Sequence, residues 1–166
     1  MFLNMKRENR VHMSNITIRE ASLEDLPDLL KLEQNIIDSE RPYDPYIKED
    51  NVSYYDIPEL ISDANSHLVV VESGNEIIGS GYAQIRPSKP CLTHEKHCYL
   101  GFIYLKPVHR GKALGHKMID KLKKWGVSKG MQHFQLGVYA ENKSAIRAYE
   151  KAGFKNVSVM MELIDE

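Results

Sequence analysis

Residues 108–119 read VHRGKALGHKMI, and no other stretch of the sequence says more about the fold. It follows an apolar run, Tyr99–Leu105, that is typical of a strand, and it opens an amphipathic helix. A turn of small residues between a strand and a helix N-terminus presents backbone N–H groups that bind phosphate or pyrophosphate. Glycine suits such a turn because a side chain would keep the ligand away from the backbone. The stretch therefore predicts a strand, an anion-binding turn and a helix.

The chain after this turn predicts the second half of an α/β domain. A helix is expected over residues 112–129, because Leu114, Met118 and Leu122 recur at helical spacing. The elements expected after it are a strand over 134–139, a helix over 142–152 capped by Asn142, and a final strand over 154–163.

The chain before the turn supplies the rest of the sheet. Ser22 and Asp25 form a capping box, and the helix after it carries its apolar face on Leu26, Leu29, Leu30, Ile36 and Ile37. The other expected elements are a strand over 16–21, a proline-containing loop up to Pro58, a helix over 58–64, and strands over 67–73 and 76–86 joined by a Gly74–Asn75 turn. The fold class is therefore α/β, a mixed and mainly antiparallel sheet flanked by helices, in the order β-α-α-β-β-β-α-β-α-β.

Composition narrows the class of protein. The 166 residues fit one domain, expected over 15–166, with 1–14 as a flexible polar extension. A net charge of −1 gives no drive toward nucleic acid or an anionic membrane, and no apolar run reaches the roughly 18 residues of a membrane span. Cys91 and Cys98 lack metal-ligand spacing, so we expect no metal site and a reducing cytoplasmic location.

Two segments carry a family resemblance. Residues 110–115, RGKALG, resemble the Gln/Arg-x-x-Gly-x-Gly/Ala loop of the GNAT family of N-acetyltransferases. Residues 142–154, NKSAIRAYEKAGF, are similar to that family's second signature, Asn-x-x-Ala-x-x-x-Tyr-x-x-x-Gly-Phe. Ala113 departs from the pattern, since the family usually has its first glycine there. Alanine is small enough for the ligand to approach if its φ stays negative, so we expect binding to survive.

The resemblance implies acetyl-CoA as donor and a primary amine as acceptor. It places the cofactor where the fourth and fifth strands splay apart, with its pantetheine arm paired to the backbone of the fourth strand like an added strand. A backbone N–H on that strand would polarise the thioester carbonyl. The implied cofactor-binding residues are Ile103, Tyr104, Leu105, Arg110, Gly111, Lys112, Ala113, Leu114, Gly115, His116, Asn142 and Tyr149.

The resemblance also implies that Tyr149 protonates the departing thiolate. A phenol has a reference pKa of about 10, near that of a thiol, so the transfer would be close to balanced. Taken alone, Tyr149 is better explained as a helix tyrosine that packs its ring on the sheet and leaves its hydroxyl at the surface.

The general base is not evident. Family members carry a glutamate at one of two positions, which here hold Tyr99 and Gly137. Local alternatives are His94, Glu95 and His97 before the fourth strand, and a histidine titrates near neutrality. A chain of water molecules would serve equally, and each of the three side chains also reads as a solvated loop residue.

The segment after the first helix is the candidate acceptor site. Glu40 and Asp44 would attract a cationic amine, and Arg41 would hold a carboxylate, a combination that suits an amino acid. A polar loop with local salt bridges explains the same residues. A closed pocket here favours small molecules, whereas an open groove favours peptides.

We therefore predict a cytoplasmic N-acetyltransferase that acts on a small amine or an amino-acid-like molecule by direct attack. A protein N-terminus or lysine is the alternative acceptor. An acyl-CoA-binding sensor without catalysis is the alternative from another class, because the usual glutamates are missing. The final strand offers an edge through which a homodimer would form.

Overall fold

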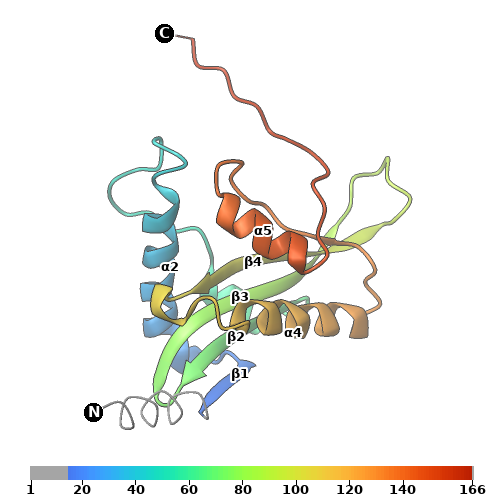
Figure 1. Ribbon diagram of the computed structural model, residues 1–166. Coiled ribbons are helices and arrows are strands. Elements are labelled where there is room, and N and C mark those ends of the chain that lie inside the picture. Colours follow the sequence, from blue (N-terminus) through green and yellow to red (C-terminus); the bar gives the residue numbers. More distant parts are fainter. Residues whose placement is uncertain (1–14, 166) are drawn as a thin grey trace.

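The computed structural model describes residues 15–165, so the predicted 1–14 extension lies outside the described part. One sheet holds the strands in chain order (Figure 1). Its strands are β1 (Ile16–Glu20), β2 (Ser66–Ser73), β3 (Glu76–Pro87), β4 (Lys96–Leu105) and β5 (Phe134–Gln135). The first four pair antiparallel, and β5 runs parallel to β4. The predicted mixed, mainly antiparallel sheet is confirmed.

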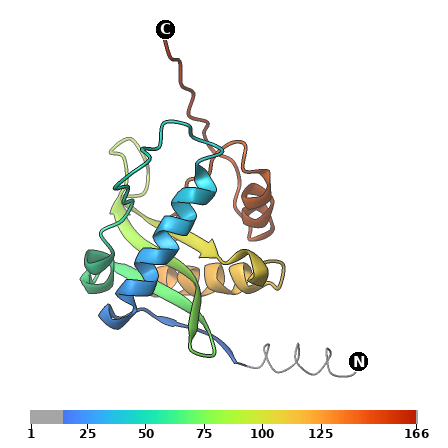
Figure 2. The same cartoon turned by 90° about the vertical axis from the view of Figure 1, so that its left-hand side faces the viewer.

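Helices cover both faces of this sheet (Figure 2). They are α2 (Leu26–Glu40), α3 (Ile57–Ser62), α4 (Leu114–Ser128) and α5 (Lys143–Lys151), with short 3₁₀ turns η1 (Leu23–Asp25) and η2 (Pro107–His109). Two predicted helix starts are confirmed: the backbone N–H of Ser22 donates to Asp25 Oδ2 at 2.8 Å, and Asn142 Oδ1 accepts from the N–H of Ala145 at 3.1 Å. Within residues 15–165, none of the helices is long and apolar enough to cross a bilayer.

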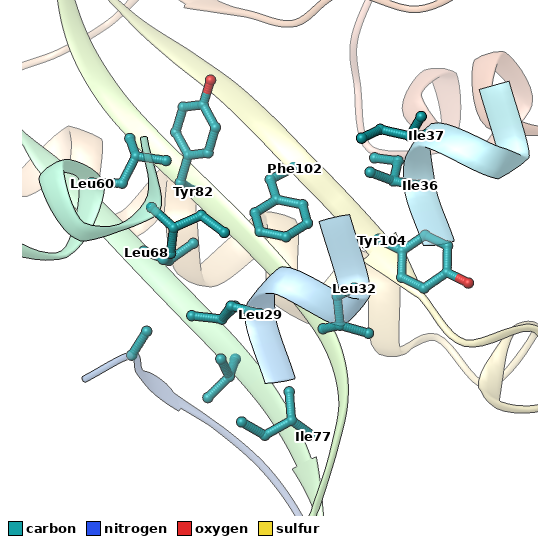
Figure 3. Packing of buried hydrophobic residues seen from close by; sticks show 13 residues of the cluster. Leu29, Leu32, Ile36, Ile37, Leu60, Leu68, Ile77, Tyr82, Phe102 and Tyr104 are labelled. Carbon is teal, nitrogen blue, oxygen red and sulfur yellow. The ribbon is translucent and has the colours of Figure 1, made fainter. Parts of the chain in front are cut away.

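The core on the α2 side joins helix and sheet (Figure 3). Leu29, Leu32, Ile36 and Ile37 of α2 are buried against strand residues that include Leu68, Tyr82, Phe102 and Tyr104. Leu30, which was expected on this face, is 46% exposed, so that prediction is wrong. Leu32 takes its place, since positions 29, 32, 36 and 37 complete one stripe of the helix.

A β-bulge interrupts β4 in the middle of the sheet. Ser80 pairs with Tyr104 and Tyr82 pairs with Gly101, so one residue of β3 faces two of β4, Phe102 and Ile103. Phe102 adopts a φ of +51°, and its carbonyl accepts a bond from Ser80 Oγ at 3.0 Å. The extra residue shifts the side-chain alternation, so Leu100 packs on the α4 side of the sheet whereas Phe102 and Tyr104 face α2.

Pairing between β4 and β5 is short. Only Cys98–Phe134 and Tyr99–Gln135 are partners, so the strand predicted over 134–139 is wrong beyond Gln135. The bulge increases the twist of β4 immediately after this point, which turns the strand away from its neighbour. Among the described residues, the outer edge of β4 from Leu100 to Leu105 therefore has no strand beside it.

The final strand predicted over residues 154–163 is also wrong. Residues 154–165 form no helix or strand, and this segment extends away from the domain (Figure 1). With β5 only two residues long, the sheet offers this segment almost no edge to pair with. Its apolar side chains lie largely exposed, from 76% to 97%, at Val157, Val159, Met160, Met161 and Leu163.

Candidate functional site

The turn before α4 forms the first part of the site. Gly111 has a φ of +75°, and the first helical bond runs from the N–H of Lys117 to the carbonyl of Ala113 at 3.1 Å. The backbone N–H groups of Leu114, Gly115 and His116 precede that bond, and helix geometry leaves them without intrahelical acceptors. They carry the positive end of the helix dipole. This turn is therefore suited to an anionic group.

Ala113 departs from its predicted conformation. It has a φ of +59° and a ψ of +10°, in the left-handed region, whereas we expected a negative φ. Ala113 is the N-cap of α4, a position that usually has extended backbone, so its left-handed conformation is also a departure from ordinary N-cap geometry. The methyl group strains the backbone there by about 1–2 kcal/mol relative to a residue without Cβ.

The charged residues around the turn differ in their placement. Arg110 donates from Nε to the carbonyl of Leu105 at 2.9 Å, and its guanidinium lies 5.4 Å from the ring centre of Tyr104. Arg110 thus ties the turn to the end of β4. Lys112 is exposed, and His116 lies 3.5 Å from Asp120 on the next turn of α4. Among these three, Lys112 extends most freely from the turn.

The unpaired edge of β4 continues from this turn. Ile103, Tyr104 and Leu105 lie on it, beyond the bulge. The ring of Tyr104 is buried under α2, so this residue offers a ligand its backbone rather than its side chain. The carbonyl of Leu105 already accepts from Arg110, so the free groups of this edge lie before it. Extended backbone with free N–H and C=O groups accepts an added strand or a ligand with amide groups.

Tyr149 of α5 lies at the far end of this edge. Its ring packs against the α4-side core and lies 6.2 Å from Phe154 in an edge-on arrangement. Burial, with smaller contributions from Glu40 and Tyr99, raises the pKa of Tyr149 to about 12. The near match between phenol and thiol expected from reference values therefore does not hold. The phenol stays protonated throughout the neutral range.

A cavity of about 450 Å³ lies beside the end of α2. Tyr139, in the segment between β5 and α5, donates from its hydroxyl to Asp44 Oδ2 at 3.2 Å, and its ring stacks on Tyr43 with centroids 6.0 Å apart. The cavity thus joins the loop after α2 to the segment before α5. The residues that line it are Glu40, Asp44, Tyr46, Ile47, Lys48, Asn51, Val52, Ser53, Tyr54 and Tyr139.

Glu40 is the half-buried carboxylate of this cavity. Burial raises its pKa, the negative charge of Asp44 raises it further, and hydrogen bonding with Tyr54 acts in the opposite direction. Burial and the charge of Glu40 likewise raise the pKa of the Tyr54 phenol. The cavity therefore favours a cation, which would relieve both effects.

Glu33 holds the wall of this cavity in place. One carboxylate oxygen accepts from the backbone N–H groups of Tyr54 at 2.7 Å and Tyr55 at 2.9 Å, and from Ser53 Oγ at 3.2 Å. Tyr55 then stacks on Phe102 of the bulge with centroids 4.7 Å apart. Glu33 was not among the predicted site residues, although a charged residue inside the apolar stripe of a helix indicates a buried, hydrogen-bonded carboxylate.

Arg41 uses its guanidinium within its own loop. It donates to the carbonyls of Ile47, Lys48 and Glu49 at 3.3, 2.9 and 3.3 Å, and its Nε lies 3.1 Å from Asp38. These bonds fix the 41–56 loop that covers the cavity. They leave Arg41 little capacity to hold a substrate carboxylate.

A family model described as the acetyltransferase (GNAT) family matches residues 29–154, well over half of the chain. The chain belongs to this family. The match covers α2 from Leu29 onward, the bulged β4, the turn before α4, and α5 with the residues after it up to Phe154. Both segments whose sequence resembles GNAT signatures lie inside it.

Individual proteins are similar over shorter stretches or by fold. Thialysine N-epsilon-acetyltransferase of Sus scrofa is 35% identical over 63 residues, which are 38% of this chain and 37% of the relative. A predicted acetyltransferase of Clostridium acetobutylicum, solved with acetyl-CoA, superposes with a TM-score of 0.71 at 19% identity, covering 90% of this chain and 96% of that one. Glucosamine-6-phosphate N-acetyltransferase of Arabidopsis thaliana gives 0.67 at 22% identity, covering 92% and 99%.

The two positions where GNAT members carry a glutamate base meet in this structure. A Cβ placed on Gly137 would lie 3.2 Å from the hydroxyl of Tyr99. The Tyr99 ring in turn lies under the guanidinium of Arg86, 3.9 Å from its centre. The tyrosine hydroxyl thus occupies the space that a side chain at 137 would need. Neither position supplies a carboxylate.

The three side chains considered as alternative bases lie at the start of β4. His97 Nδ1 is 3.1 Å from Ser88 Oγ, and its pKa is lowered by burial and then by Arg86 and His94. His94 bonds to the same Ser88 hydroxyl at 2.8 Å, and Glu95 is exposed. Phe102 is the fifth residue after His97, so His97 lies about 16 Å from the bulge along the strand.

Proposed function

We propose that this GNAT chain is an acetyl-CoA-dependent enzyme that acetylates a primary amine of a small or amino-acid-like molecule by direct attack. The observation that carries the proposal is the unpaired edge of β4, which runs from the anion-binding turn to Tyr149. A long, narrow cosubstrate with a pyrophosphate at one end and a thioester at the other suits this arrangement.

Acetyl-CoA would lie with its pyrophosphate on the backbone N–H groups of residues 111–116. Its pantetheine arm would pair with Ile103, Tyr104 and Leu105. A backbone N–H near the bulge would polarise the thioester carbonyl, and Tyr149 would return a proton to the thiolate. The Oδ1 atom of Asn142 caps α5, so its amide nitrogen is the part that would contact the arm.

The size of the cavity favours a small acceptor. The cavity, of about 450 Å³, has room for a small molecule, and it is open toward solvent rather than closed. Glu40 and Asp44 supply negative charge for an ammonium group. The named substrates of the two relatives, thialysine and glucosamine-6-phosphate, are small amines, which supports the same class here.

Tyr149→Phe distinguishes this enzyme from a cofactor sensor. We expect thiol release from acetyl-CoA, measured with a panel of small amines, to fall about 100-fold, while acetyl-CoA still raises the melting temperature. Tyr82→Phe is the matched control, since it removes the same atom from a buried phenol that bonds to Arg86. A wild-type protein that binds acetyl-CoA and releases no thiol with any amine would support the sensor instead.

We also propose a cytoplasmic homodimer. Both cysteines are free thiols, which suits a reducing compartment.

The exposed apolar side chains of residues 157–163 would be covered by strand pairing with a second copy, next to the short β5. Light scattering should give twice the chain mass, and Val157→Asp with Val159→Asp should halve it; a monomeric wild-type protein would contradict the dimer.

A further inference from the structure

Glu40 occupies a special place in the acceptor cavity. It is the last residue of α2, it is half-buried, and it shares the cavity with Asp44, Tyr54 and Tyr139. Asp44 Oδ2 already accepts a bond from the Tyr139 hydroxyl. Asp44 Oδ1 also accepts from the backbone N–H of Tyr46 at 3.0 Å, so both of its carboxylate oxygens are bonded, whereas Glu40 is hydrogen-bonded with Tyr54. Glu40 therefore has more capacity left to accept a proton.

The cavity adjoins the reacting end of the cofactor edge. Tyr54 lines the cavity, and the next residue, Tyr55, stacks on Phe102 at the bulge. Glu33 fixes both tyrosines through their backbone N–H groups. One dipeptide thus connects the cavity with Phe102 on the free edge of β4, so an amine held in the cavity would lie near the thioester.

The charged and titratable groups around Glu40 come from every neighbouring element. The groups that line the cavity or interact electrostatically with its members are carboxylates, phenols and a lysine, and the Glu40 carboxylate also acts on the phenol of Tyr149 across the site. These groups are Asp44 and Lys48 of the loop, Tyr54 and Tyr55 before α3, Tyr139 before α5, and Tyr149 of α5. Burial and Asp44 raise the pKa of Glu40, which makes it a stronger base than an exposed glutamate.

We propose that Glu40 is the general base that removes a proton from the acceptor ammonium group, a role that rests on the proposed acetyltransferase function. Glu40 takes one proton, and the nitrogen lone pair forms a C–N bond to the thioester carbon. The C–S bond then breaks, and the thiolate takes the proton of Tyr149. The second proton on nitrogen restores the Tyr149 phenol, and Glu40 releases its own proton to solvent.

The pH dependence of kcat/KM tests this role. The wild-type value should fall as pH drops through the raised pKa of Glu40 and should be flat above it. Glu40→Gln should lower kcat/KM about 100-fold at pH 7 and leave it rising about tenfold per pH unit, because only amine that is already neutral reacts. The ratio of the wild-type kcat/KM to that of Glu40→Gln should therefore shrink toward pH 9.5. Glu40→Asp should restore part of the activity and the flat profile.

Glu59→Gln on the exposed side of α3 is the matched control, and it should keep the wild-type profile. A shift in melting temperature with acetyl-CoA, equal for wild type and Glu40→Gln, shows that the variant folds. A deficit that is the same at every pH, or no deficit, would overturn the role of Glu40 while leaving the acetyltransferase function intact. A wild-type protein that releases no thiol with any amine would overturn both.

Discussion

The cofactor end and the acceptor end of the candidate site are built in different ways. The cofactor end consists of backbone groups from one continuous stretch, the unpaired edge of β4 and the turn up to His116. The acceptor end consists of side chains, with Glu40, Tyr54 and Tyr139 contributed by three separate segments. A site made of backbone tolerates changes of side chain, whereas a site made of side chains can be altered for a new acceptor without disturbing the cofactor.

The largest change confined to one end of the site is expected when Glu33 is replaced. Glu33→Ala leaves the partly buried N–H groups of Tyr54 and Tyr55 without this acceptor, so we expect a loss of about 3 kcal/mol in the free energy of unfolding. The KM for the amine should rise and acetyl-CoA affinity should not change. Urea denaturation and thermal shift measure these two quantities.

Gln34→Ala is the control for Glu33. Gln34 bonds to the carbonyl of Val52 in the same loop, but it is exposed, so less than about 1 kcal/mol should be lost. Equal losses for the two variants would show that Glu33 has no special part in holding the acceptor wall.

Gly111→Ala should affect the cofactor end alone. A Cβ at a φ of +75° strains the turn by about 1–2 kcal/mol, and we expect acetyl-CoA to bind about tenfold more weakly. Gly74→Ala imposes the same backbone penalty in the β2–β3 hairpin, at a φ of +62°, away from the site. Titration calorimetry with acetyl-CoA should separate the two variants; equal affinities would contradict the placement of the pyrophosphate.

Asp44→Asn should affect the acceptor end alone and more weakly. Removing one negative charge from the cavity should raise the KM for a cationic amine about fivefold, or about 1 kcal/mol, at unchanged kcat. Raising the salt concentration should reduce the difference. Steady-state kinetics at two ionic strengths measure it, and an unchanged KM would mean that the amine does not use this carboxylate.

Ala113→Gly should have the smallest effect, and it should stabilise the protein rather than weaken it. Glycine relieves the strain at a φ of +59° but loses more conformational entropy on folding, so we expect a gain of about 0.5–1 kcal/mol. The melting temperature should rise by about 2–4 °C. A fall would mean that the Ala113 methyl group makes a favourable contact that outweighs the strain.

Local signals predicted most of the fold. The capping box at Ser22, the cap at Asn142 and the turn at Gly74 each depend on residues within a few positions, and the structure has all three. The strand predicted over 134–139 ends at Gln135, and the strand predicted over 154–163 does not form. Both predictions failed because strand pairing requires a partner that is distant in the sequence. The bulge at Phe102 determines where that partner ends, and the sequence alone does not reveal it.

The same distinction applies to the site. The turn at residues 110–116 was predicted because its chemistry is local to one stretch. The parts played by Glu33 and Tyr139 were missed, because each depends on contacts across the fold, to Tyr54 and to Asp44. Glu40 and Asp44 were identified from their charge as attractive to a cation, but the bond from Tyr139 to Asp44, which distinguishes the two, is a contact across the fold.

A thermal-shift titration with acetyl-CoA, CoA and ATP tests whether the turn before α4 and the free edge of β4 bind the cosubstrate. A ligand at about 100 times its dissociation constant adds about 2.7 kcal/mol to the stability of the folded protein, which raises the melting temperature by several degrees. We predict this rise with acetyl-CoA and with CoA, and none with ATP, because ATP lacks the arm that pairs with β4. No rise with either CoA compound would contradict the account.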